Sequence, residues 1–167
     1  MLFKTVNPRS IKDTLIKCLA EEWALITAGN KDDYNMMTAS WGFFGEMWGN
    51  DSVAIAVRPQ RYTMEFIDKN DYFTVSFYGD KKEIHKICGS KSGREVDKTK
   101  ETGLTPVKNE KYVYFKEARM VLVVKKQFVQ RINEDAFIDK TVIDKWYPEK
   151  DYHNMIIGKI EKVLIAD

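Results

Sequence analysis

The sequence predicts a mainly β protein with peripheral helices, an α+β fold built around a mostly antiparallel barrel. Apolar runs rich in β-branched and aromatic residues, such as SVAIAVR and YFTVSFY, recur along the 167 residues. Helical patterns do not alternate regularly with these runs, which argues against a doubly wound parallel sheet. The 44% hydrophobic content, without an internal repeat or a low-complexity linker, predicts a single domain over residues 1–167.

Two helices and three strands are expected in the first part of the chain. Ile11, Leu15 and Leu19 recur at helical spacing, so residues 8–20 are expected to form a helix. Pro59 is a residue tolerated in a first helical turn, and a short helix is expected to begin there. The turn-forming GNKDDYN is expected to join the first two strands as a hairpin. The three strands are expected at 23–29, 36–43 and 52–58.

The rest of the chain continues with strands and short helices. Asp80 is expected to cap a helix that ends before Gly89, and Gly158 is expected to bend the last strand. In chain order the expected elements are a strand at 72–78, a helix at 80–90, one or two helical turns within 91–103, two or three strands within 112–132, a short helix at 139–147 and a strand at 153–167. The total is about six or seven strands.

Charge and cysteine content restrict the partners. The net charge of +2, from 27 basic and 25 acidic residues, lacks the excess that nucleic-acid binding requires. No apolar run approaches the length of a membrane span, and the first ten residues lack a signal-peptide core. Cys18 and Cys88 have no metal-ligand spacing and are too few for a disulfide framework. We expect a cytoplasmic protein with reduced thiols and without a nucleic-acid or membrane partner.

The stretch NMMTASWGFFG, at 35–45, mixes apolar residues with hydroxyl-bearing ones. It can be a half-buried strand in which Thr38 and Ser40 face water. It can also be a strand whose backbone and hydroxyls face a ligand, with Trp41 bordering that ligand. The pattern by itself leaves both interpretations open.

Two further segments combine positive charge with features suited to an anion. In RPQRYT, Arg58 and Arg61 lie where a strand should pass into a helix, whose first N–H groups favour phosphate. The alternative is a solvated turn whose arginines pair with nearby acids. In CGSKSGREVDK, small residues accompany Lys91, Arg94 and Lys98, but the spacing is not that of a phosphate-binding P-loop. Alone, this segment reads as an ordinary exposed loop.

The histidines do not form a recognisable catalytic or metal-binding motif. His85 is expected at the surface of a helix, whereas His153 precedes the last strand, where it could reach a pocket. Two histidines without clustered carboxylates argue against a zinc site, and there is no G-x-S-x-G motif for a serine hydrolase. Cys88 is expected to be a small buried apolar residue rather than a reactive thiol.

Together these segments resemble the flavin reductase-like family, of the flavoredoxin type, whose members have the FMN-binding split-barrel fold. The resemblance extends over nearly the whole chain in family order. It rests on WALITAG, YNMMTASWG, VRPQRYT, NDYFTVSF, CGSKSGREVDK, TGLTP, EARMVLV and DYHNMIIGKI.

The resemblance implies noncovalent FMN at or near a homodimer interface, reduced by NADH, NADPH or a redox protein. Met37 to Trp41 would border the isoalloxazine ring. His153 would approach the ring and influence nicotinamide docking or proton delivery, although KDYH stands where the family more often has Gly-Asp-His. The residues expected to bind the cofactor are Asn35, Met37, Thr38, Ala39, Ser40, Trp41, Arg58, Gln60, Arg61, Tyr62, Thr63, Ser90, Lys91, Ser92 and Lys98. Those from Arg58 to Thr63 would hold the ribityl chain and phosphate, and those from Ser90 to Lys98 would close over the phosphate.

Three functions follow from these observations. The first is a flavin reductase or flavoredoxin-like electron carrier, in which the cofactor performs the chemistry and no strong general acid or base is needed. The second is a non-catalytic module that stores or senses flavin. The third, a nucleic-acid-binding barrel, rests only on Arg58, Arg61 and the loop 91–98, and the small net charge argues against it.

Overall fold

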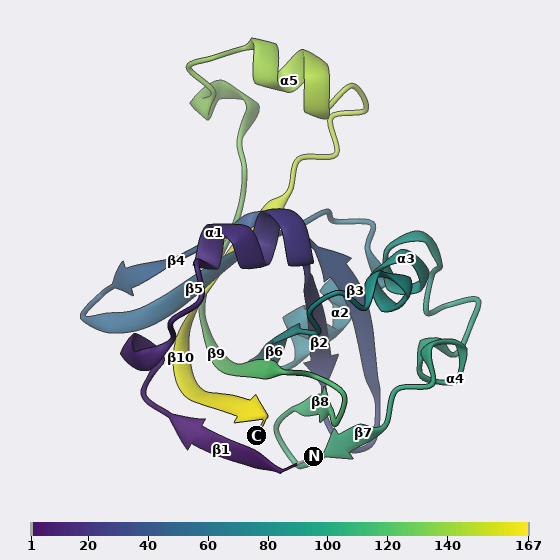
Figure 1. Cartoon of the computed structure of the whole chain (residues 1–167). Coiled ribbons are helices and arrows are strands. Elements are labelled where there is room, and N and C mark those ends of the chain that lie inside the picture. Colours follow the sequence, from purple (N-terminus) through teal and green to yellow (C-terminus); the bar gives the residue numbers. More distant parts are fainter. Residues whose placement is uncertain (1, 167) are drawn as a thin grey trace.

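One antiparallel sheet organises the chain in the computed structural model, which describes residues 2–166. Seven strands follow the order β3-β2-β6-β9-β10-β5-β4, and β1 adds to β10. Figure 1 shows this sheet curled into a barrel with helices around it. The strands of this sheet are β1 (Phe3–Val6), β2 (Ala24–Gly29), β3 (Tyr34–Ala39), β4 (Gly42–Met47), β5 (Asn50–Val57), β6 (Tyr72–Phe77), β9 (Met120–Arg131) and β10 (Asn154–Ala166). A separate pair is formed by β7 (Pro106–Lys108) and β8 (Val113–Phe115).

Alternation along the strands decides which side chains form the core. On β5, Val53, Ile55 and Val57 point inward and are fully buried, as period-2 spacing requires. A second apolar cluster on the other face of the sheet includes Met36 of β3 and Cys88 of the helix α3 (Lys82–Ser90). The mainly β fold with peripheral helices is therefore confirmed.

Short helices surround the barrel. They are α1 (Leu15–Lys17) continued by the π-helical η2 (Cys18–Glu22), α2 (Tyr62–Lys69), α3 (Lys82–Ser90), α4 (Lys98–Thr102) and α5 (Thr141–Trp146), with 3₁₀ turns η1 (Pro8–Ser10) and η3 (Glu134–Ala136). Within residues 2–166, no helix has the length and apolar content to cross a membrane.

The continuous helix expected over 8–20 is wrong. The 3₁₀ turn η1, capped by the Asn7 side chain accepting from the Arg9 amide, ends at Ile11 in extended backbone. Helical structure resumes only at Leu15. A capped first turn followed by an extended residue interrupts the helix in spite of the apolar spacing.

The single strand expected over 36–43 is also wrong. The β2–β3 hairpin forms as predicted, but β3 ends at Ala39 and the chain passes through two residues into β4, which pairs with β5. A Cβ on Gly42 would overlap the Ala54 carbonyl oxygen, so glycine permits the close approach of β4 to β5. The stretch therefore links the two ends of the sheet order.

Several element boundaries differ from expectation. Helix α2 begins at Tyr62 rather than Pro59, and Lys81 rather than Asp80 occupies the N-cap of α3. Gly89 lies inside α3 rather than past its end. The short strands β1, β4 and β7 raise the number of strands in residues 2–166 to ten, above the expected six or seven. The bend at Gly158 is confirmed by a register shift between β9 and β10.

Candidate functional site

Two neighbouring cavities open at one end of the barrel and share Arg61. The strand cavity, of about 240 Å³, is lined by Met37, Thr38, Ala39, Ser40, Trp41, Ala56, Arg58, Arg61, Trp146 and His153. The loop cavity, of about 200 Å³, is lined by Asn35, Gln60, Arg61, Tyr62, Thr63, Ser90, Lys91, Ser92, Gly93 and Lys98. Together they reach the volume of about 300–1,000 Å³ that is typical of ligand sites.

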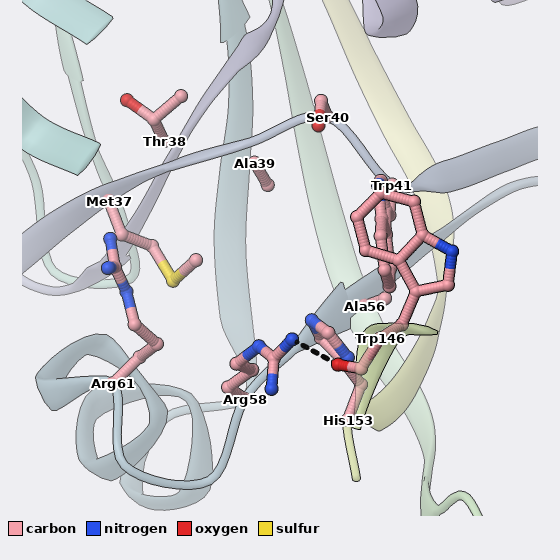
Figure 2. A pocket seen from close by; sticks show the side chains of 10 residues that line it. All are labelled: Met37, Thr38, Ala39, Ser40, Trp41, Ala56, Arg58, Arg61, Trp146 and His153. Atoms are coloured by element: carbon pink, nitrogen blue, oxygen red, sulfur yellow. Dashed lines mark hydrogen bonds between the residues drawn. The ribbon is translucent and has the colours of Figure 1, made fainter. Parts of the chain in front are cut away.

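Residues at the ends of three strands form most of the lining of the strand cavity. Residues 37–41 run along β3 and past its end, Arg58 follows β5 directly, and His153 directly precedes β10. Because β10 pairs with β5, Asn154 lies opposite Val57, which places His153 near Arg58. Figure 2 shows Arg61 and Trp146 at opposite sides of this group of side chains.

Aromatic side chains form one side of the strand cavity. The Trp41 and His153 rings lie 4.8 Å apart, and the Trp146 ring meets Trp41 edge to face at 5.1 Å. The Tyr147 hydroxyl lies 2.9 Å from His153 Nδ1. Burial, with the nearby Arg58 charge, lowers the pKa of His153 to about 4. His153 is therefore neutral at neutral pH.

Arg58 is bound to a different part of the chain. Its guanidinium forms an ion pair with Asp151 and donates to the Trp146 carbonyl oxygen at 2.9 Å, the contact dashed in Figure 2. Gln60 donates to the same Asp151 carboxylate at 2.7 Å. These hydrogen bonds, with the Arg58 charge, hold the pKa of Asp151 below its usual range. Arg58 thus lines the strand cavity while its donors are directed to residues 146–151.

Thr38 lines the strand cavity, and its side chain is bonded to α3. Its hydroxyl donates to the His85 carbonyl oxygen at 2.8 Å and lies 3.4 Å from His85 Nδ1. The expected surface position of His85 is wrong, because this side chain is buried between the rings of Trp23 and Tyr78. Its helix covers the sheet, so the face that carries His85 is turned inward. Burial, with the Lys82 charge, lowers the pKa of His85 to about 4.

The loop cavity contains two cations that have no acidic partner. Lys98 is only 5% exposed, and its ammonium donates to the carbonyl oxygens of Met36 (2.8 Å) and Cys88 (3.1 Å). Arg61 donates to the carbonyl oxygens of Gly89 (2.8 Å) and Cys88 (3.3 Å). Neither forms an ion pair with a carboxylate in residues 2–166. Burial lowers the pKa of Lys98 to about 8 and also lowers the pKa of Arg61.

Close packing around the Asn35 side chain shapes the rest of the loop cavity. The Asn35 amide donates to the Thr63 hydroxyl at 2.9 Å, which joins β3 to α2. A Cβ on Gly93 would overlap the Asn35 amide oxygen, so any larger residue there would require the Asn35 side chain to shift. Lys91 is paired with Glu101 at 2.6 Å, toward the outside of the loop.

Every residue that the sequence predicted for the site lines one of the two cavities, and their role in binding a cofactor stays a prediction. Sequence reasoning missed Ala56, Gly93 and Trp146. Gly93 was recognisable from its small-residue segment. Trp146 gave no signal, because it lies far along the chain in a short helix. Cys88 is buried as expected, and burial raises the pKa of its thiol to about 11.

Residues 16–167 match the family described as "Flavin reductase like domain". No curated protein matches the chain. Several solved structures are similar to it, among them two flavoredoxins and an FMN-binding protein. Flavoredoxin from Methanosarcina acetivorans has a TM-score of 0.69 and 19% identity, over 87% of this chain and 69% of that one. Flavoredoxin of Desulfovibrio vulgaris (Miyazaki F) has a TM-score of 0.66 and 23% identity, over 87% of this chain and 69% of that one. An FMN-binding protein from Thermus thermophilus has a TM-score of 0.64 and 20% identity, over 84% and 68%.

These likenesses show the fold. The curled antiparallel sheet, with β3 and β4 joined across its two ends, is a split β-barrel, as the sequence predicted.

Proposed function

This chain belongs to the flavin reductase-like family, and we propose that it binds FMN noncovalently and passes electrons through it as a flavin reductase or flavoredoxin-like carrier. The family and the fold of its structural neighbours support a flavin-related function. The site residues must then supply a phosphate site and a place for a flat ring.

The observation that carries the proposal is the unpaired positive charge of the loop cavity. Buried charges in proteins are normally paired, because an isolated one is costly to remove from water. Lys98 and Arg61 donate only to neutral carbonyl oxygens, and both pKa values are lowered by burial. A phosphate dianion would complete the missing ion pairs. The serine-rich and glycine-containing loop 90–93 leaves room for such a group.

The strand cavity has the residues that a flavin ring requires. Met37 and Ala39 belong to the apolar core cluster, and Trp41 supplies an aromatic edge. Strand β3 lies at the end of the sheet order, so one backbone edge of this strand has no strand partner in residues 2–166. Since the two cavities share Arg61, one ligand with a ring and a phosphate can occupy both. FMN is such a ligand.

When bound, FMN would accept a hydride equivalent from a reduced nicotinamide and pass electrons to an acceptor. The residues of this chain bind and orient. Lys98 and Arg61 hold the phosphate, and the β3 backbone holds the ring. His153 is neutral at neutral pH, so we assign it an orienting role beside Trp41 rather than that of a proton donor.

The proposal includes a homodimer. Phe43, Ala54, Ile157 and Phe128 stand in register across β4, β5, β10 and β9, on the outward face of the sheet. Phe43 is 66% exposed, and the Trp48 ring lies 6.0 Å from Phe128. Ala56 shares this face of β5 and lines the strand cavity. A second copy of this chain on the apolar face would therefore reach the cavity mouth.

A visible spectrum of the purified protein tests the proposal. We expect a yellow protein, or one that becomes yellow with FMN, whose absorbance bleaches when NADH or NADPH is added anaerobically. Riboflavin, which lacks the phosphate, should bind at least tenfold more weakly than FMN. A protein that cannot bind FMN would refute the proposal. Binding without reduction by either nicotinamide would favour reduction by a redox protein, and binding without turnover with any donor would favour the storage or sensing module.

A further inference from the structure

The Trp146 side chain reaches the strand cavity from outside the barrel. It is carried by the excursion, residues 133–152, which leaves the sheet after β9 and returns at β10. Figure 1 shows the excursion standing away from the barrel with α5 near its tip. A backbone hydrogen bond from Ile132 N to the His153 carbonyl oxygen, 2.9 Å long, closes its base. In the described chain, the two core clusters contain no excursion residue.

The excursion has its own aromatic cluster and a polar connection to the barrel. The Tyr147 ring lies 5.8 Å from Phe137 and 4.9 Å from Tyr152. Arg58 lies over the Tyr147 ring at 5.3 Å, donates to the Trp146 carbonyl oxygen and pairs with Asp151. A single barrel residue therefore contacts the excursion at three positions. Its guanidinium sets where the Trp146 backbone lies.

Trp146 and Trp41 border the mouth of the strand cavity. They are 43% and 37% exposed, and the other residues lining this cavity are buried or half-buried. Their rings are nearly perpendicular, at 87°. This arrangement leaves aromatic surface at the mouth, whereas the β3 residues lie deeper. Once the flavin ring of FMN occupies the cavity, a second flat ring that enters would contact Trp146 at the mouth.

We propose that Trp146 is a specificity-determining residue that binds the nicotinamide ring of the electron donor at the cavity mouth, with Arg58 and Asp151 as positioning residues. This rests on the proposed function, because it assigns the second substrate of the same site. Nicotinamide dinucleotides combine a flat ring with an anionic tail. Trp41 and Trp146, whose rings meet edge to face at the cavity mouth, suit the flat ring.

The test begins with FMN-loaded protein and measures the binding of the non-reducing probes NAD⁺ and NADP⁺ by isothermal titration calorimetry. Stacking on an aromatic side chain stabilises a bound flat ring, so Trp146→Ala should weaken binding of the preferred probe about tenfold. Trp146→Phe should bind within threefold of the unaltered chain. Ile138→Ala, which shortens a fully exposed apolar side chain on the same excursion, is the control and should have no effect.

The positioning role of Arg58 and Asp151 is tested by a separate measurement. Asp151→Asn removes the ion pair with Arg58 and should raise KM for the reduced nicotinamide about threefold to tenfold. Its reduction by dithionite, which needs no docking of a ring, should be unchanged. Circular dichroism checks that each variant is folded.

Several results would overturn the inference. One is an FMN-loaded unaltered chain that binds neither probe. Another is a Trp146→Ala protein that binds the probe as tightly as the unaltered chain. A third is a Trp146→Ala protein in which the dissociation constant for FMN rises as much as the dissociation constant for the probe. Trp146 would then belong to the flavin site. An unaltered chain that does not bind FMN overturns the proposed function instead.

Discussion

The Lys98 ammonium donates to the Met36 carbonyl oxygen at 2.8 Å. This buried side chain joins helix α4 to strand β3. The same ammonium donates to the Cys88 carbonyl oxygen at the end of α3. Three elements therefore meet at one positive charge. The proposed phosphate site depends on this arrangement.

Replacing Lys98 by Met should weaken FMN binding about 10- to 100-fold, because a hydrogen bond to a charged group contributes about 1.5–3 kcal/mol. Riboflavin affinity should change less than threefold, since riboflavin has no phosphate. Fluorescence titration with both flavins measures the difference. Lys100→Met, two residues along the same helix and exposed, is the matched control. Equal losses for both flavins would show a general disturbance of the fold.

FMN affinity should decrease as the pH rises through about 8. The pKa of Lys98 is lowered to about 8, so above this pH the ammonium must take up a proton before it can pair with the phosphate. Affinity should be nearly constant from pH 6.5 to 7.5 and then fall by up to about tenfold per pH unit. The Lys98→Met protein should show no such dependence. A pH-independent affinity in the unaltered chain would contradict the assignment of Lys98.

Acid should destabilise the fold through its two histidines. Both have folded-state pKa values of about 4, below the usual 6.5. The unfolded chain therefore takes up protons that the folded chain does not, and stability is lost as the pH falls from about 6.5 toward 4. Between pH 7 and 5 each histidine should cost on the order of 1–2 kcal/mol of unfolding free energy.

Urea unfolding at several pH values tests this prediction. The double variant His85→Gln with His153→Gln should have a flatter profile between pH 7 and 5. Most carboxylates titrate below this range, so they contribute little to the difference. A double variant with the unaltered slope would contradict the prediction.

Gly93→Ala should damage the loop cavity. The new Cβ would overlap the Asn35 amide oxygen, whose amide group is bonded to Thr63. Overpacking of this kind costs about 1–3 kcal/mol. Urea unfolding and FMN titration should both show the loss. Gly45→Ala is the control, because a Cβ there meets no atom within 4 Å. Equal behaviour of the two variants would argue against close packing at Gly93.

Charges on the outward apolar face should prevent dimerisation. Phe43→Lys with Phe128→Lys would place two ammonium groups on the face that is proposed to bind a second copy. Light scattering after size-exclusion chromatography should change from a dimer to a monomer mass, with FMN bound several-fold more weakly. Ile138→Lys, fully exposed on the excursion, is the control. A monomeric unaltered chain would contradict the proposed dimer.

Much of the architecture was predictable from local patterns. Strands such as β2, β5 and β6 are runs of apolar and β-branched residues, and their periodicity does not depend on the rest of the chain. The hairpin between β2 and β3 was predictable from its turn residues. The two basic segments were predictable for the same reason, because their charge and small residues are local features.

The remaining features depend on contacts between distant residues. The break after Ala39 exists because the barrel brings β4 against β5, which no local periodicity records. His85 is buried because α3 packs on the sheet, and Lys98 has no acidic partner only because of what the fold places around it. Trp146 reaches the cavity through Arg58, 88 residues earlier in the chain. Composition and spacing thus predicted the elements and the candidate segments, whereas barrel closure decided which side chains are buried, which charges stay unpaired and which ring borders the mouth.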